Sequence, residues 1–226
     1  TIMNQNSFLG IIEQSIRNNW DLPAMTDYEG KTLYYRDFAR EIDKLHDIFK
    51  VAGVQRGDKI SLCGMNSSNW AIVFFATLSY GAVSVNILNE FDISSVQFIV
   101  DHSDSNLFFV DESIWSGIDE TKIPKAETVF SLDNFSLLKS VSDDLKQFIS
   151  NASDYFTEKY SKGFFVNDIN FRTDKPEELA LINYTSGTTS SPKGVMLPYR
   201  SLWSNTKFAM ENVIFFLPGD NVVCML

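Results

Sequence analysis

Residues 59–88 carry the clearest architectural signal in the chain and read KISLCGMNSSNWAIVFFATLSYGAVSVNIL. The run Lys59–Cys63 is typical of a buried strand. Gly64–Asn69 contains turn and N-cap residues, and an apolar helix is predicted from Ser68 to about Tyr80. Gly81 ends that helix, and Ala82–Leu88 alternates with the period of two that favours a strand. The segment therefore predicts a strand, a helix and a second strand, all of them buried.

The same segment contains no Asp, Glu, Lys or Arg between Ile60 and Asn89, so it has to be compared with a membrane span. A spanning helix needs about 20 consecutive apolar residues. Turn residues at 64–69 and the glycine at position 81 interrupt the run. We therefore predict no transmembrane segment, an expectation that leaves peripheral membrane contact open.

Helix and strand patterns alternate on both sides of this unit. Helices are predicted at Phe8–Trp20, Phe38–Phe49 and around Val96–Val100, and strands at Thr32–Tyr34, Leu107–Val110 and Thr128–Phe130. The more polar Asp133–Asp174 is predicted to be a connector over the sheet, with helices at Val141–Ile149 and Ala152–Tyr160. Such alternation predicts an α/β fold, with a mostly parallel sheet and helices on both faces.

The composition is that of a globular protein. The chain has 226 residues, of which 44% are hydrophobic and 21% charged, and its formal net charge is −10. Length favours a single domain. An acidic balance argues against nucleic acid and anionic membranes as partners, because phosphate neutralisation needs a basic face.

The two cysteines, Cys63 and Cys224, cannot form a disulfide framework. Both lie in apolar runs, which predicts buried, inert thiols and no metal site. The first residues show neither a basic region nor an apolar core of a signal peptide, so a cytoplasmic location is predicted.

The last residues, Val222–Leu226, have the pattern of an apolar strand with no turn or polar tail after it. We therefore interpret residues 1–226 as a single partial domain, the N-terminal part of a longer protein.

One segment combines small, hydroxyl-bearing and basic residues in a way found nowhere else in the chain. Residues 181–196 read LINYTSGTTSSPKGVM, in which two apolar strands flank a run of Ser, Thr and Gly. Small side chains let backbone N–H groups approach an anion, hydroxyls add donors, and Lys193 adds a compact positive charge. The segment is therefore a candidate polyphosphate-binding loop.

The sequence disfavours three other interpretations of this loop. A flexible Ser/Thr linker or a wide hairpin is the usual meaning of such composition, but the flanking strands and the closing Pro-Lys-Gly disfavour it. The P-loop of NTPases needs Gly before Lys and a helix after it, whereas Lys193 precedes Gly194 and a strand follows. No early strand leads into a G-x-G-x-x-G sequence, so a dinucleotide fold is unsupported.

Residues 184–195 resemble the signature loop of the adenylate-forming superfamily, which comprises acyl- and aryl-CoA ligases, amino-acid adenylation domains and luciferases. The family pattern is threonine, serine or alanine, glycine, threonine, threonine or serine, glycine, any residue, proline, lysine, glycine. The chain departs from it only at Ser190, where glycine is usual. The resemblance extends to four further segments, Thr32–Phe38, Val54–Ile60, Ala76–Val83 and Leu202–Asp220.

The resemblance implies a function for the complete protein, closest to that of long-chain fatty acid–CoA ligases. ATP and Mg²⁺ would activate a carboxylic acid to an acyl-adenylate, and the acyl group would pass to coenzyme A. Lys193 would be the catalytic cation. The nucleotide-binding residues would be Thr185, Ser186, Gly187, Thr188, Thr189, Ser190, Lys193 and Gly194. The adenine, ribose and carboxylate sites of the family would lie beyond residue 226, so this part alone is expected to be inactive.

Two alternatives stay open, an amino-acid adenylation domain and a non-catalytic nucleotide-binding homologue. Tyr155–Glu158 and Arg172–Asp174 superficially echo later family motifs, but both precede the loop and are interpreted as helix surface and connector surface. Neither His46 nor His102 has a neighbour in sequence that would make it a catalytic base.

Overall fold

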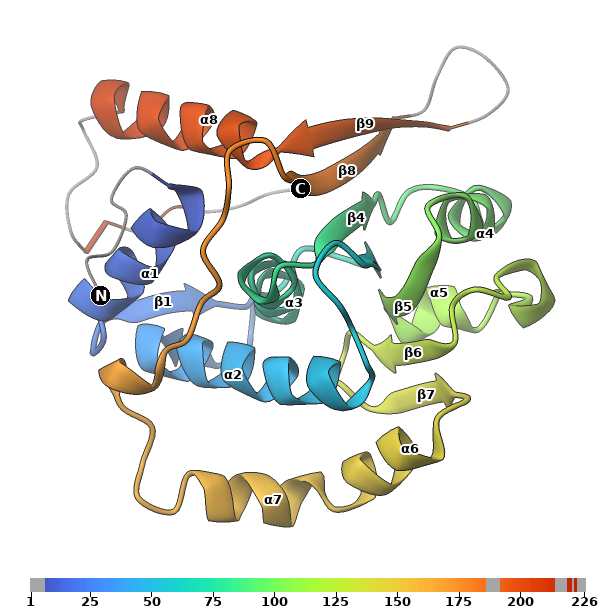
Figure 1. The fold of residues 1–226 in the computed structure, drawn as a ribbon, viewed down its shortest axis with the longest axis horizontal. Helices are drawn as coiled ribbons and strands as arrows, with labels where there is room; N and C mark the ends of the chain where they lie inside the picture. Colours follow the sequence, from blue (N-terminus) through green and yellow to red (C-terminus); the bar gives the residue numbers. More distant parts are fainter. Residues whose placement is uncertain (1–6, 186–191, 214–218, 221, 223–226) are drawn as a thin grey trace.

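A computed structural model describes residues 7–185, 192–213, 219–220 and 222 (Figure 1). The α-helices are α1 (Phe8–Asn18), α2 (Tyr35–Val51), α3 (Ser68–Tyr80), α4 (Ile93–His102), α5 (Glu112–Trp115), α6 (Asp143–Ser150), α7 (Ala152–Lys159) and α8 (Tyr199–Asn212). The 3₁₀ helices are η1 (Glu120–Lys122) and η2 (Val166–Asp168). The strands are β1 (Pro23–Thr26), β2 (Thr32–Tyr34), β3 (Lys59–Cys63), β4 (Val83–Ile87), β5 (Ser105–Val110), β6 (Thr128–Ser131), β7 (Leu137–Ser140), β8 (Leu179–Thr185) and β9 (Lys193–Pro198).

The described strands form one large sheet of seven strands in the order β7-β6-β5-β3-β4-β8-β9. The five inner strands are parallel to one another, whereas β7 and β9 pair antiparallel with them at the two edges. Strands β1 and β2 make a separate antiparallel pair. The predicted α/β fold with a mostly parallel sheet is confirmed.

Helices cover both faces of the sheet, and successive side chains on a strand point to opposite cores. On β3, Leu62 joins the core under α2 and α3, and Cys63 joins the core under α4. On β5, Phe109 belongs to the core under α2 and α3, and Phe108 belongs to the core under α4. Figure 1 shows α2 and α3 on one side of the sheet and α4 and α5 on the other.

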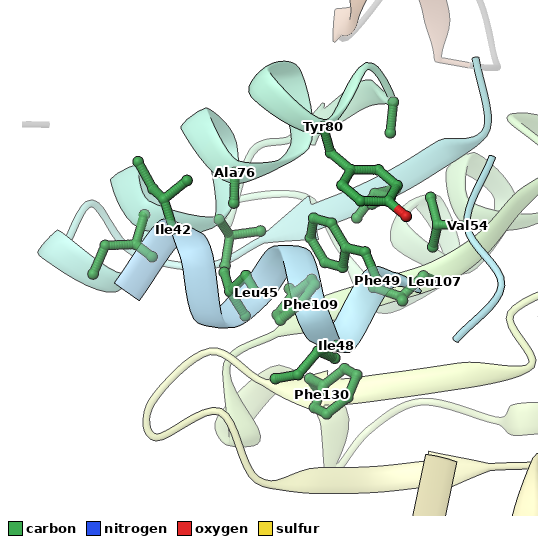
Figure 2. Close-up of a cluster of buried hydrophobic side chains, with 14 of the residues drawn as sticks. Ile42, Leu45, Ile48, Phe49, Val54, Ala76, Tyr80, Leu107, Phe109 and Phe130 are labelled. Atoms are coloured by element: carbon green, nitrogen blue, oxygen red, sulfur yellow. The ribbon is translucent and has the colours of Figure 1, made fainter. Parts of the chain in front are cut away.

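The larger core lies between α2, α3 and the sheet (Figure 2). Phe49 of α2 is completely buried and contacts Tyr80 of α3 edge-on at 5.5 Å between ring centroids. It also contacts Phe109 of β5 at 6.1 Å, and Phe109 stacks on Phe130 of β6 at 5.3 Å. Aromatic contacts thus join two helices to two strands.

The central strand–helix–strand unit has the predicted bounds for β3 and α3, and β4 is one residue shorter at each end than predicted. The N-cap Ser67 accepts a hydrogen bond from the Trp70 N–H at 3.1 Å. The C-cap Gly81 has φ +91°, a left-handed conformation that a residue with a Cβ adopts only with strain. Turn chemistry visible in the sequence therefore sets both ends of α3.

The structure also corrects the sequence interpretation in places. Strands β1 and β7 were not predicted. Helix α6 packs against both α2 and the edge strand β7, and Lys159 of α7 forms ion pairs with Asp43 and Asp47 of α2. Asp174 is not connector surface: it is buried, and it accepts a hydrogen bond from the Phe8 N–H at 3.2 Å. The predicted strand Val222–Leu226 and Cys224 fall outside the described residues, apart from Val222.

Among the described residues, no helix has the length and apolar character needed to cross a membrane. Cys63 is buried, as predicted, and burial raises the pKa of its thiol to about 12, which leaves it protonated and unreactive at neutral pH.

Candidate functional site

The sheet order creates a crevice between β3 and β4. The chain moves from β3 across to β4, and from β4 back past β3 to β5. Because crossovers are right-handed in nearly all proteins, these opposite moves place α3 and α4 on opposite faces. Open α/β sheets bind ligands where the strand order reverses in this way, at the carboxyl ends of the strands.

A cleft of about 530 Å³ lies at this point. Its walls come from the carboxyl ends of β3, β4 and β8 and from the first turn of α3. The lining residues are Gly64, Asn66, Trp70, Asn86, Ile87, Leu88, Asn89, Glu90, Asn183, Tyr184 and Thr185. Asparagine amides offer both donors and acceptors, so the wall suits a ligand with several polar groups.

Side chains of residues that follow β5 and β6 pack closely against Gly64, which follows β3 in the cleft lining. A Cβ on Gly64 would lie 2.4 Å from Asp111 Oδ1 and 2.5 Å from Leu132 Cδ2, so a larger residue there would displace both side chains. The Met65 N–H donates to Asp111 Oδ2 at 2.8 Å. Burial raises the pKa of Asp111, and the negative charge of Asp133 acts in the same direction. This carboxylate therefore holds the turn after β3 in place.

The residues on either side of the candidate loop belong to β8 and β9. Thr185 is the last residue of β8 and lines the cleft, and it pairs in register with Lys193, the first residue of β9. Lys193 is exposed, and no ion pair of its ammonium is found within the described part of the chain. The structure therefore brings Thr185, Lys193 and Gly194 together, whereas Ser186, Gly187, Thr188, Thr189 and Ser190 lie outside the described residues.

Gly194 has a packing role that the sequence interpretation did not include. It pairs with Tyr184 across the β8–β9 ladder. A Cβ at this position would lie 2.9 Å from Ile182 Cγ2 and 3.1 Å from Tyr184 Cζ. The Tyr184 ring therefore crosses the space that a side chain at 194 would occupy, which is a steric reason for glycine in the Pro-Lys-Gly sequence.

A second contact of Tyr184 was missed from the sequence. His102, the last residue of α4, lies 2.8 Å through Nδ1 from the Tyr184 hydroxyl, and the two rings meet edge-on at 6.0 Å. Tyr184 itself is buried, and burial raises the pKa of its hydroxyl. The two residues are 82 positions apart, and only the position of β8 beside β4 brings them together.

Residues 12–226 match the AMP-binding enzyme family. This span is nearly the whole chain and includes the loop flanked by Thr185 and Lys193. The chain belongs to the AMP-binding enzyme family. Its membership agrees with the position of the cleft and of the two loop arms at the carboxyl edge of the sheet.

Two plant relatives illustrate the similarity. Long chain acyl-CoA synthetase 1 of Arabidopsis thaliana is 24% identical over 176 residues, which cover 74% of this chain and 25% of the relative. Probable acyl-activating enzyme 10 of the same plant is 32% identical over 157 residues, which cover 68% of this chain and 28% of the relative. The chain thus spans about a quarter of the length of these relatives.

Two solved structures illustrate the same fold. An anthranilate CoA ligase, AuaEII, solved with anthranoyl-AMP, superimposes with a TM-score of 0.72 over 93% of this chain and 38% of its own, at 17% identity. MatB from Rhodopseudomonas palustris with bound ATP superimposes with a TM-score of 0.65 over 91% of this chain and 37% of its own, at 19% identity. At these identities the likeness concerns the fold.

Proposed function

We propose that the complete protein activates a carboxylic acid with ATP and transfers the acyl group to coenzyme A. In the first step the carboxylate oxygen attacks the α-phosphorus of ATP, giving an acyl-adenylate and releasing pyrophosphate. In the second step the thiol sulfur of coenzyme A attacks the acyl carbon and releases AMP. Family membership and the names of the relatives support this proposal.

The pairing of Thr185 with Lys193 at the edge of the cleft is the observation that carries the proposal. It puts a hydroxyl and an exposed cation at the two arms of the loop, beside a polar cleft. The proposed nucleotide-binding residues are those named from the sequence, Thr185 to Ser190 with Lys193 and Gly194. Such a cation stabilises the charge that develops on the transferring phosphates.

Magnesium belongs to the proposal as the ion that accompanies the triphosphate. Mg²⁺ in proteins is commonly bound by substrate phosphates together with one or two carboxylates. Among the described residues that line the cleft, Glu90 carries a carboxylate and could therefore be a ligand of this ion. When bound, the ion would neutralise charge on the phosphates.

The finer part of the proposal is that the acid is a long-chain fatty acid and that the protein acts in the cytoplasm. The similarity to long chain acyl-CoA synthetase 1 supports the first point. Apolar side chains of Trp70, Ile87 and Leu88 in the cleft wall are compatible with a substrate that is partly hydrocarbon.

Acid-dependent exchange of labelled pyrophosphate into ATP tests the proposal in the complete protein. Fatty acids of eight to eighteen carbons, aryl acids and the amino acids are each supplied with ATP and Mg²⁺. Exchange that is strongest with a long-chain acid, followed by thioester formation on addition of coenzyme A, is the expected result. Exchange only with an amino acid would replace the proposal with an adenylation domain, and no exchange with any acid would refute catalysis.

A further inference from the structure

The Tyr184 side chain touches three parts of the molecule at once. It lines the cleft, its ring lies against Gly194 of β9, and its hydroxyl lies 2.8 Å from Nδ1 of His102 on α4. It is only 4% exposed, so its position is set by these neighbours. Lys193 immediately precedes, on β9, the glycine that the ring contacts.

His102 is in turn supported by its own helix. Phe98, one turn earlier on α4, stacks on the imidazole at 5.1 Å between ring centroids, with the rings inclined by 22°. The hydroxyl of Tyr184 can donate to Nδ1 or accept from it, so either tautomer of His102 maintains the contact. The imidazole is exposed on its outer side, whereas the hydroxyl that it meets belongs to a buried residue.

We propose that Tyr184 and His102 are positioning residues for Lys193: the hydrogen bond fixes the Tyr184 ring against Gly194, and the ring fixes the start of β9. The expected effect on catalysis rests on the proposed function. The contact that links α4 to β9 through Tyr184 does not depend on it. Neither side chain is assigned contact with the reacting atoms. A group that acts only in the transition state loses much of its effect when it is misplaced by about 1 Å.

The test uses the complete protein and three single variants of the pair. Tyr184→Phe keeps the ring and removes the hydroxyl. His102→Ala removes the imidazole, and His102→Asn offers an amide near the position of Nδ1 as a conservative rescue. The control is Tyr199→Phe, which deletes the hydroxyl of another buried tyrosine, hydrogen-bonded to the Leu78 carbonyl at 3.0 Å, at the start of α8.

Hydrogen exchange of the peptide that covers residues 193–198 measures the mechanical link without any reference to activity. Tyr184→Phe and His102→Ala should accelerate exchange there, while His102→Asn and Tyr199→Phe should leave it close to wild type. Unchanged exchange in Tyr184→Phe and His102→Ala would overturn the inference, whether or not the protein proves to be an adenylating enzyme.

Kinetics of acyl-adenylate formation test the catalytic consequence. Tyr184→Phe and His102→Ala should each lower kcat about tenfold and change the KM for ATP less than about twofold, and His102→Asn should recover most of the loss. Because Tyr184 acts through Lys193, the double variant Tyr184→Phe/Lys193→Ala should be no slower than Lys193→Ala alone. The inference would be overturned if the losses in kcat were additive in the double variant, or if Tyr199→Phe lowered kcat as much as Tyr184→Phe does. A wild-type protein without adenylating activity would refute the proposed function, and the exchange experiment would still decide the inference.

Discussion

Lys193 is an exposed cation at the first position of β9, and its partner across the ladder, Thr185, lines the cleft. An ammonium group on a flexible stem can approach phosphates after they bind. The interaction of the Lys193 ammonium with the phosphates strengthens as charge develops on the transferring group. Loss of Lys193 should therefore lower turnover more than it lowers nucleotide affinity.

Lys193→Ala in the complete protein should therefore slow acyl-adenylate formation by ~10²-fold or more, with a smaller change in the KM for ATP. Pyrophosphate exchange at saturating ATP measures this. Thr188→Ala removes a hydroxyl and leaves the backbone donors, so it should slow acyl-adenylate formation less than Lys193→Ala does. Near-normal exchange in Lys193→Ala would restore the interpretation of residues 185–192 as a Ser/Thr linker.

Gly194 gives a prediction about stability at the same scale. A Cβ there meets Ile182 Cγ2 at 2.9 Å and the buried Tyr184 ring at 3.1 Å. Overpacking costs about 1–3 kcal/mol, which outweighs the ~0.4–1 kcal/mol gained by restricting the unfolded chain. Gly194→Ala should lower the free energy of unfolding in urea by about 1 kcal/mol, whereas Val195→Ala on the exposed surface of β9 should change it by less than about 0.5 kcal/mol. Equal effects of the two variants would contradict this packing argument.

At the scale of elements, α2 and α3 are joined by a partly buried histidine. Nε2 of His46 lies 2.9 Å from Ser79 Oγ and 3.2 Å from the Ala76 carbonyl. Since Ser79 Oγ already donates to the Phe75 carbonyl at 2.6 Å, Nε2 carries the proton and donates. Burial between Tyr80 and Phe171 lowers the pKa of His46 to about 4, although the charge of Asp43 acts against this shift.

This pKa predicts how stability depends on pH. An unfolded histidine has a pKa near 6.5, so between pH 6.5 and 4 the unfolded state binds a proton that the folded state does not. Stability should therefore fall as the pH falls through this window, by about 2 kcal/mol from pH 7 to pH 5 for this group. His46→Gln keeps a donor near Nε2 and cannot titrate. Urea unfolding at pH 7 and pH 5 measures the decrease in the free energy of unfolding for the wild type and for His46→Gln. The decrease should be smaller in His46→Gln, and an equal decrease in both proteins would show that other groups cause it.

The elements also show what the sequence can predict. The bounds of β3 and α3 follow from Ser67, Gly81 and the apolar run before them, because caps and buried strands are local signals. Strand β7 has four half-buried residues at a sheet edge, so it shows neither the continuous burial of an inner strand nor clear alternation. The contact of His102 with Tyr184 depends on the sheet order, and no local pattern encodes it.

At the scale of the whole molecule, the described residues line a cleft and include the two residues, Thr185 and Lys193, that flank a loop. The cleft is open at the carboxyl edge of the sheet, and its lining comes from three strands and one helix turn. The relatives named here are about four times as long as the part that this chain matches. Binding energy from distant parts of a substrate is what aligns its reacting atoms, so a partial site should lose catalysis before it loses all binding.

We therefore predict that residues 1–226 alone do not complete adenylation. Acyl-AMP formation should be at least ~10³-fold slower than in the complete protein, because positioning of both substrates supplies a large share of the rate. Pyrophosphate or triphosphate should still bind weakly, with an affinity that Lys193→Ala reduces. Chromatographic detection of acyl-AMP, and calorimetry with inorganic triphosphate, measure the two properties on the same preparation, whose fold is checked by circular dichroism. A rate near that of the complete protein would show that the cleft lined by β3, β4 and β8 already holds the acid and the nucleotide in reactive geometry.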